Sequence, residues 1–261
     1  MTPPTWLHWP AAGGSTPFAP DDLSDLVVWL DADDTAFSNN DPVDSWTNKG
    51  TGGDADQTDS TKRPIFKTNL LNGKPGVDFD GTNDHLQISS LALDTYITVF
   101  VVAKTTTAKP MFIEHSATAN TNNGFYFYGT SGNHYNVRRT SRNSYVGTSA
   151  WFGSAAAQAA LVIDAIATPN PMGQVYLNGA LQSDGSAAFS NSLADSSVTD
   201  TLNIFSRNGA SSFSDGDLHE LIIYNEPLAQ ADREKVEGYL AHKWGLTSSL
   251  PTGHPYKSSA P

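Results

Sequence analysis

An acidic turn is the first place where the residue types suggest metal chemistry. Within the heptapeptide that runs from position 78 to position 84, the candidate Ca²⁺ ligands are Asp78, Asp80, Asn83 and Asp84. Calcium takes several oxygen ligands from a flexible loop, and short turns rich in Asp and Asn supply them. The same residues also satisfy their own backbone in a hairpin between two strands. Both interpretations stay open, and no cofactor other than Ca²⁺ is expected.

A second candidate joins aromatic and cationic side chains in an otherwise acidic protein. The segment at positions 133–145 contains these candidate ligand-binding residues: His134, Tyr135, Arg138, Arg139, Arg142 and Tyr145. Aromatic faces stack on sugar rings, and Arg side chains bind carboxylates and sulfates through two hydrogen bonds. The alternative is a strand, a turn and a strand whose Arg side chains are solvated or pair with nearby acids.

Other acidic residues carry a weaker signal. The loop carboxylates are Asp31, Asp33, Asp34, Asp54, Asp56 and Asp59. Neither group has the spacing of an EF-hand, with its central Gly and terminal Glu, so we expect solvated side chains. The sequence also has no P-loop, GxGxxG or HExxH motif, and it has no cysteine for a thiolate zinc site.

An irregular arm precedes the domain that must position these residues. Positions 1–20 are rich in Pro, Gly and Thr and carry Trp6 and Trp9, whereas positions 21–261 form one domain. Exposed Trp side chains are costly in water. The arm therefore either folds back over its own domain or anchors to a partner chain through Trp6 and Trp9.

Composition and charge exclude several classes of partner. The 261 residues include 15 basic and 27 acidic side chains, a formal charge of −12, which disfavours nucleic acid and anionic membranes. The first residues lack the basic start and apolar stretch of a Sec signal peptide. No run of 18 apolar residues is present. A virion component made in a bacterial host meets these conditions, and so does a cytosolic protein or a trimmed chain. The expected location is a virion or an extracellular surface.

Hydrophobic patterning predicts many short strands and one helix. The expected strands lie at 25–31, 96–103, 111–114, 124–128, 135–139, 159–167, 173–177, 202–206 and 218–224. Alternation on both sides of the acidic turn predicts a hairpin over 76–88, and Asn178-Gly179 predicts another. Near the end, Val236, Tyr239, Leu240 and Trp244 form the apolar stripe of a helix that Gly245 terminates. This pattern predicts an antiparallel sandwich.

Three segments resemble a known family. The segments DLSDLVVWLDADD, NGKPGVDFDGTNDHL and SDGDLHELIIYNEPLAQADREKVEGYLAHKWGL resemble laminin-G-like and pentraxin-like jelly-roll domains of the concanavalin A-like superfamily. The resemblance covers roughly residues 21–256 and is most specific in the last segment. It implies an all-β fold of two antiparallel sheets in jelly-roll order, with one C-terminal helix. It also implies binding of glycans or proteins, sometimes through Ca²⁺, and phage members often belong to virions.

One motif raises an enzymatic alternative. Asp215-x-Asp217-x-x-Glu220 resembles the glucanase motif of related sandwiches, which begins with Glu. Glycoside hydrolysis needs two carboxylates on either side of the bond. Strict alternation puts Asp217 and Glu220 on opposite faces of a strand, and only a bulge aligns them. We therefore expect Glu220 to be a partly buried carboxylate held by hydrogen bonds.

These features together predict a recognition module that is not an enzyme. The expected partners are glycans or neighbouring protein chains, in a larger assembly such as a phage virion surface or tail. Two alternatives remain: a glucanase-like glycoside hydrolase, and a structural capsid or tail decoration protein without a ligand.

Overall fold

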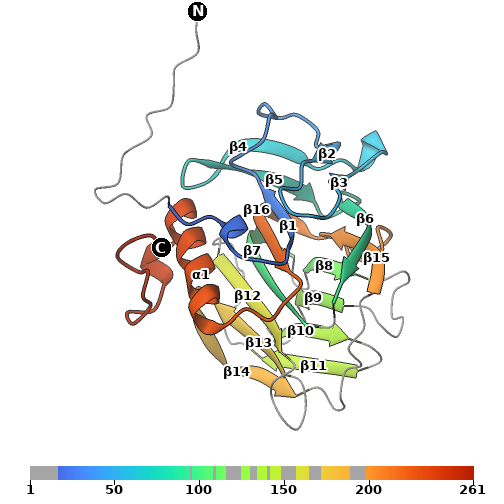
Figure 1. Cartoon of the computed structure of the whole chain (residues 1–261). Coiled ribbons are helices and arrows are strands. Elements are labelled where there is room, and N and C mark those ends of the chain that lie inside the picture. Colours follow the sequence, from blue (N-terminus) through green and yellow to red (C-terminus); the bar gives the residue numbers. More distant parts are fainter. Residues whose placement is uncertain are drawn as a thin grey trace, which may run out of the picture.

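The protein is an antiparallel β-sandwich, as the sequence predicts. The computed structural model describes residues 17–94, 96–107, 110–115, 125–129, 134–139, 142–147, 157–164, 172–188 and 198–261. Two sheets pack face to face, and the α-helix of the described residues lies outside them near the C-terminus (Figure 1). Short 3₁₀ helices lie at Pro20–Asp22, Ser60–Lys62 and Thr247–Ser249. No helix in these ranges is long and apolar enough to cross a membrane.

The first sheet carries the helix on its outer face. Its strands follow the order β4-β5-β16-β7-β12-β13-β14, and β1 also pairs with β16. Their bounds are β1 (Leu26–Asp31), β4 (Ile65–Leu71), β5 (Lys74–Asp80), β7 (Ile97–Thr105), β12 (Ala157–Asp164), β13 (Met172–Leu177), β14 (Ala180–Ala188) and β16 (Asp215–Tyr224). The strands β1 and β5 share one edge of β16, since they pair with its two different halves.

The second sheet closes the other side of the core. Its order is β2-β3-β6-β15-β8-β9-β10-β11. The bounds are β2 (Ser45–Trp46), β3 (Ala55–Asp56), β6 (Leu86–Leu93), β8 (Met111–His115), β9 (Phe125–Gly129), β10 (His134–Arg139), β11 (Arg142–Gly147) and β15 (Val198–Ile204). One residue pair, Gly147 opposite Asp184, joins β11 to β14. The two sheets therefore meet along one edge.

Aromatic and branched side chains fill the space between the sheets. Phe79 of the first sheet stacks on Phe205, which follows β15, with ring centroids 4.4 Å apart. The strand β7 is buried along nearly its whole length, as the apolar run at 96–103 predicts. One of its faces meets the core and the other lies on the side of the helix. Each large side chain that is fully buried contributes roughly 1.5–3 kcal/mol to folding.

The predicted helix is confirmed as α1 (Gln230–Trp244). Val236, Leu240 and Trp244 are fully buried, and Tyr239 is half-buried against the core. Gly245 caps the C-terminus in the left-handed region, with φ of 69°, where glycine is favoured. The helix packs against β12 (Figure 1).

One predicted hairpin is present and the other is wrong. Asn178 and Gly179, with φ of 48° and 77°, connect β13 to β14 in a two-residue turn. The acidic turn instead connects β5 in the first sheet to β6 in the second, and these strands do not pair. A turn between two alternating segments is compatible with pairing or with a crossing between sheets. The local pattern cannot distinguish them because both bury every second side chain.

Candidate functional site

The candidate site is centred on a buried carboxylate under the helix α1. Glu220 on β16 has no exposed surface. Its Oε1 accepts hydrogen bonds from Trp29 Nε1 at 2.7 Å and the Tyr239 hydroxyl at 3.1 Å. Its Oε2 accepts one from Trp244 Nε1 at 2.6 Å and pairs with Lys243 Nζ at 2.9 Å. The prediction of a carboxylate held by hydrogen bonds is confirmed, although burial is complete rather than partial.

A bulge in β16 sets the direction of this side chain. The register with β7 shifts between Leu218 and Glu220, so that Asp217 lies opposite Lys104 and Glu220 lies opposite Val102. Positions 102 and 104 share a face of β7 because alternate residues point the same way. Asp217 and Glu220 therefore lie on one face of the sheet, contrary to the strict alternation expected from the sequence.

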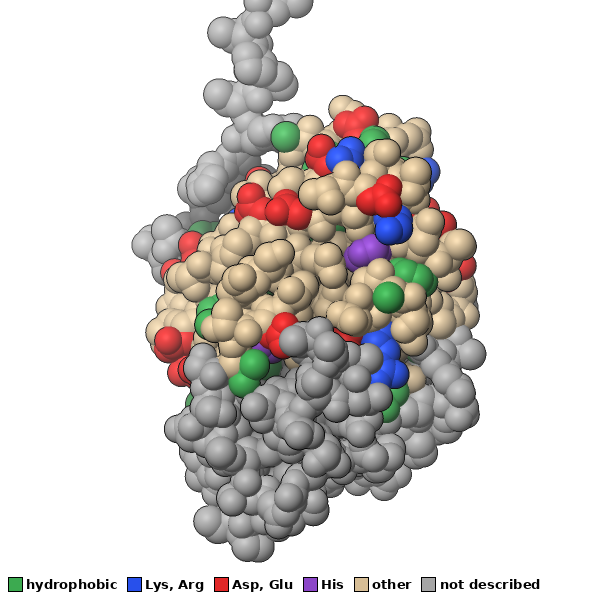
Figure 2. Space-filling model, turned by 90° about the vertical axis from the view of Figure 1, so that its right-hand side faces the viewer, with side chains coloured by type: hydrophobic (Ala, Val, Ile, Leu, Met, Phe, Trp, Pro, Cys, Tyr) green, Lys and Arg blue, Asp and Glu red, His purple; other side chains and the backbone are tan. Residues whose placement is uncertain are grey.

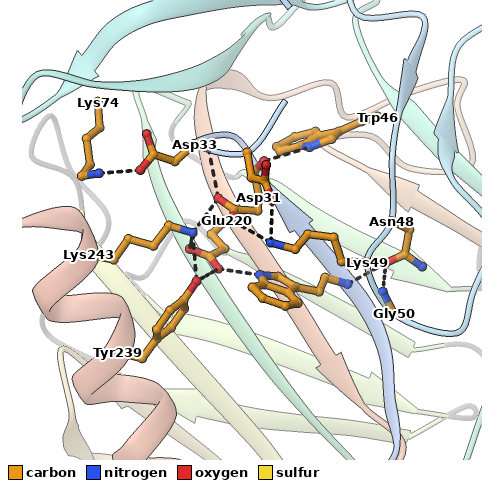
Figure 3. Close-up of polar contacts among 12 residues, drawn as sticks. Asp31, Asp33, Trp46, Asn48, Lys49, Gly50, Lys74, Glu220, Tyr239 and Lys243 are labelled. Carbon is orange, nitrogen blue, oxygen red and sulfur yellow. Dashed lines mark hydrogen bonds and ion pairs between the residues drawn. The ribbon is translucent and has the colours of Figure 1, made fainter. Parts of the chain in front are cut away.

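Asp31 extends the buried charges toward the surface. Its carboxylate pairs with Lys243 Nζ at 2.5 Å and Lys49 Nζ at 3.3 Å (Figure 3). Lys49 also pairs with Asp34 at 3.0 Å and lies 3.6 Å from the centre of the Trp29 ring. The prediction that Asp31 is solvated is wrong, since only 5% of its side chain is exposed. A cation from the distant helix makes this burial possible.

Burial and charge pairing shift the pKa values of Glu220, Lys49 and Tyr239. Burial raises the pKa of Glu220, and the charge of Lys243 opposes that rise. Burial alone would lower the pKa of Lys49, but its hydrogen bond to Asp34 and the charge of Asp31 outweigh burial and raise the pKa. Burial, followed by the charge of Glu220, raises the pKa of Tyr239 far above its usual range. The tyrosine therefore stays a hydrogen-bond donor.

Hydrogen bonds between the Asn48 side chain and the backbone hold the segment that carries Lys49 against β1. Asn48 Oδ1 accepts from the backbone N–H groups of Trp29 at 2.7 Å and Gly50 at 3.0 Å. Its Nδ2 donates to the Val27 carbonyl at 3.0 Å. A Cβ at Gly50 would lie 2.6 Å from the Val27 carbonyl carbon, so the close approach requires glycine. The Lys49 ammonium is thereby placed over the Trp29 ring (Figure 3).

A pocket of about 610 Å³ opens beside this cluster. It lies between the loop after β1 and the segment around β2, and its lining residues are Asp34, Thr35, Ala36, Phe37, Ser45, Thr47 and Lys49. The Asp34 side chain is 71% exposed, in agreement with the predicted solvated carboxylate. Phe37 is half-buried and packs on Phe66 with ring centroids 5.9 Å apart. The pocket thus joins one aromatic wall with hydroxyls, a carboxylate and an ammonium.

The acidic turn uses its oxygen atoms internally. Asp80 Oδ1 accepts from the backbone N–H groups of Thr82, Asn83 and Asp84, at 2.8, 3.2 and 3.3 Å. Asp84 Oδ2 accepts from the backbone N–H of Asp80 at 3.2 Å. Burial, with the nearby charge of Asp80, raises the pKa of Asp84 to about 6. This pattern fits the structural interpretation, in which Asp and Asn satisfy their own backbone.

The remaining predicted metal ligand, Asp78, lies two residues before Asp80 on β5. Asp78 is opposite Asp217, and burial together with the Asp217 charge raises the pKa of Asp78. Asp217 also pairs with Lys104 at 3.6 Å. Among the residues that the structure describes, no three His, Cys, Asp or Glu side chains are arranged to hold a metal ion. Calcium at this turn stays a prediction.

The predicted ligand-binding hairpin is present as backbone. β10 and β11 pair from His134 opposite Gly147 to Arg139 opposite Arg142. The side chains of the six candidates lie outside the described residues: His134, Tyr135, Arg138, Arg139, Arg142 and Tyr145. Trp6 and Trp9 also lie outside them.

A row of polar side chains crosses the described part of the second sheet. Cross-strand partners in successive strands are Gln87, Asn203, Glu114 and Tyr126. Directly opposite residues share one face of a sheet. Gln87 Nε2 donates to Asn203 Oδ1 at 2.7 Å, and Asn203 and Glu114 are fully buried. Sequence reasoning missed this row, although a single polar residue flanked by apolar ones in a strand is its signal.

Comparison with known proteins establishes the fold. No protein-family model matches the sequence, and no curated protein matches it. Domain 4 of AbnA, a GH43 extracellular arabinanase from Geobacillus stearothermophilus, in complex with arabinotriose, is 14% identical with a TM-score of 0.56. That match covers 79% of this chain and 95% of the domain.

A second group of similar structures comes from a sialidase. Trypanosoma rangeli sialidase is 11% identical with a TM-score of 0.56, and its complex with sialic acid is 12% identical with the same TM-score. Each match covers 89% of this chain but only 36% of the sialidase chain. The protein therefore spans about a third of that length. At identities of 11–14%, the similarity shows that the β-sandwich fold is shared and shows nothing further.

Proposed function

We propose that the protein is a recognition module that binds carbohydrate without cleaving it. The observation that carries the proposal is the composition of the pocket beside β2. A volume of about 610 Å³ can hold a small saccharide, since ligand pockets span roughly 300–1,000 Å³. Phe37 offers an aromatic wall for a sugar ring, while Asp34 and Thr47 offer groups for its hydroxyls.

The similar structures support the same class of ligand. The arabinanase domain, which matches over 95% of its length, is in complex with arabinotriose, and the sialidase, which matches over 36% of its length, is in complex with sialic acid. On the face drawn in Figure 2, the described acidic and basic side chains are scattered among uncharged polar groups. Such a surface suits ligands that are bound by hydrogen bonds and stacking.

Enclosure of Glu220 supports a role without catalysis. A glycosidase needs an acid and a second carboxylate that both reach the scissile bond. Four donors occupy the oxygens of Glu220, and a substrate cannot reach them unless the helix moves. Asp217 is buried as well, beside Lys104 and Asp78. These carboxylates are suited to holding strands and helix together.

Glucanase-like hydrolysis is the second candidate because the bulge aligns Asp217 with Glu220. Incubation with β-glucans and arabinan, followed by a reducing-sugar assay, separates the two functions. We expect no release above the buffer blank. Release that disappears in Glu220→Gln, with unchanged melting temperature, would replace binding by hydrolysis as the proposed function.

Binding itself is tested by calorimetric titration with arabinotriose and by a glycan array. We expect Phe37→Ala to weaken binding of the best saccharide by about tenfold or more, since stacking contributes roughly 0.5–1.5 kcal/mol beyond the loss of apolar contact. Leu181→Ala is the matched control, because it removes an exposed apolar side chain on β14. Equal affinities of Phe37→Ala and the native chain would show that the pocket is not the binding site.

A further inference from the structure

We infer that the pocket beside β2 selects neutral sugars and rejects sugars that carry a carboxylate or sulfate. The inference rests on the proposed function and names its ligand class. Carbohydrate ligands differ in charge: the similar arabinanase domain is in complex with arabinotriose, a neutral sugar, whereas sialic acid, which is bound by the sialidase that matches over 36% of its length, is anionic. The electrostatics of the lining residues decide between them.

The single cation among the lining residues is already engaged. Lys49 Nζ contacts the carboxylates of Asp31 at 3.3 Å and Asp34 at 3.0 Å, and it lies 3.6 Å from the centre of the Trp29 ring. An ammonium has three N–H donors, and these three neighbours surround it. An incoming sugar carboxylate would have to displace Asp34 or Asp31 to reach it.

The other cations of the cluster are paired too. Lys74 contacts Asp33 at 2.5 Å, and Lys243 contacts both Asp31 and Glu220 (Figure 3). No cation of this cluster is therefore left for an anionic ligand. The formal charge of −12 on the whole chain adds a repulsion of the same sign at longer range.

Asp34 supplies the attraction for a neutral sugar. Its Oδ2 is bonded to Lys49, whereas its Oδ1 makes no hydrogen bond to the described residues, and its side chain is 71% exposed. An exposed carboxylate oxygen accepts hydroxyl donors in charge-assisted hydrogen bonds. The same oxygen repels a sugar carboxylate. One residue thus attracts neutral sugars and disfavours acidic ones.

The matched pair lactose and 3′-sialyllactose, together with arabinotriose, tests the selectivity. A glycan array and calorimetric titration of the best array hit and its sialylated or sulfated counterpart give the ratio of affinities. We expect the neutral member to bind at least about tenfold more tightly, because like charges brought together disfavour a partner. The Asp34→Asn variant keeps a carbonyl acceptor but loses the charge, so we expect the ratio to shrink.

Asp232→Asn is the matched control, because it removes an aspartate that pairs with a lysine on the distant helix. It should leave the ratio unchanged. Array hits confined to acidic glycans, or a ratio unaffected by Asp34→Asn, would overturn the selectivity while carbohydrate binding stands. No binding of any neutral or acidic saccharide would overturn the proposed function as well. An exposed ion pair contributes little to stability, so both variants should fold.

Discussion

His219 shows how one residue can be held in a single protonation state. Its Nδ1 lies 2.9 Å from the Pro75 carbonyl, which places the proton of the neutral ring on Nδ1. Its Nε2 is buried without a hydrogen-bond partner among the described residues, and the ring lies 5.3 Å from that of Trp244. A Cβ at Gly76 would lie 2.6 Å from the imidazole, so glycine makes room for it. Burial lowers the pKa of His219 to about 4.

This depressed pKa predicts a loss of stability in mild acid. The unfolded chain binds the proton near pH 6.5, whereas the folded protein resists it down to about pH 4. The contribution of neutral His219 to the free energy of unfolding should therefore be complete above pH 6.5. It should fall by up to about 3 kcal/mol as the pH drops to 4.

Urea unfolding at pH 7 and pH 4.5 measures this loss. The His219→Gln variant should show a smaller drop between the two pH values, because it has no group to protonate there. The raised pKa of Asp84 acts with the opposite sign in both proteins, so it cancels in the comparison. The same drop in native and variant proteins would assign acid sensitivity to other groups.

Burial and exposure of single residues were more predictable than their distant partners. The sequence predicted Glu220 as a carboxylate held by hydrogen bonds in the last strand and Asp34 as a solvated loop carboxylate, but it did not identify the donors to Glu220. It did not predict that Lys243 would reach Asp31, since that contact joins the helix to the first strand. Lys49 and Phe37 were missed for the same reason. A pocket formed by two loops has no local signature.

At the scale of elements, the buried ion pairs join β1, β16 and α1. Lys243 on the helix contacts carboxylates from both strands, Asp31 and Glu220. Replacement of Lys243 by Met would leave two buried carboxylates facing each other without their shared cation. Loss of one partner of a buried pair costs about 3–5 kcal/mol. We expect Lys243→Met to lower the free energy of unfolding by that amount.

Chemical denaturation of single and double variants checks this prediction. Glu220→Gln keeps the shape of the side chain and removes one of the two negative charges. The double variant Lys243→Met/Glu220→Gln should therefore lose less stability than the sum of the single variants, because contacting residues are not additive. Strict additivity would mean that Lys243 and Glu220 do not interact in the folded protein.

Element positions were predicted better than element partners. The strand at 96–103 and the helix ending at Gly245 are confirmed. Both were predictable because burial periodicity and helix capping depend on residues that are close together in the chain. The hairpin over 76–88 is wrong because pairing depends on which sheet the chain enters next. Asp217 and Glu220 could share one face of the sheet only if β16 contained a bulge, and that bulge is present after Leu218. Its existence follows from packing on β7, which no local pattern encodes.

At the scale of the whole molecule, the last residues of the N-terminal arm pack on the domain. The structure describes the chain from residue 17, where Phe18 lies edge-on to Tyr239 with ring centroids 6.4 Å apart. The Pro20 carbonyl accepts a hydrogen bond from the Tyr224 hydroxyl at 2.9 Å. The end of the arm is therefore part of the domain. Anchoring of Trp6 and Trp9 to a partner chain, in a virion or another assembly, stays a prediction.

Two truncations separate these roles of the arm. Removal of residues 1–16 keeps the contacts of Phe18 and Pro20, so the melting temperature should stay nearly unchanged. Removal of residues 1–20 deletes both contacts, and the buried Tyr224 hydroxyl loses its acceptor, at a cost of about 1–3 kcal/mol. Differential scanning calorimetry should show a melting temperature several degrees lower for the longer truncation.

Assembly is measured in parallel by light scattering of the native chain and the shorter truncation. If Trp6 and Trp9 anchor a partner chain, only the native chain should form the larger species. A lower melting temperature for the shorter truncation, with unchanged assembly, would instead place these tryptophans on the domain's own surface.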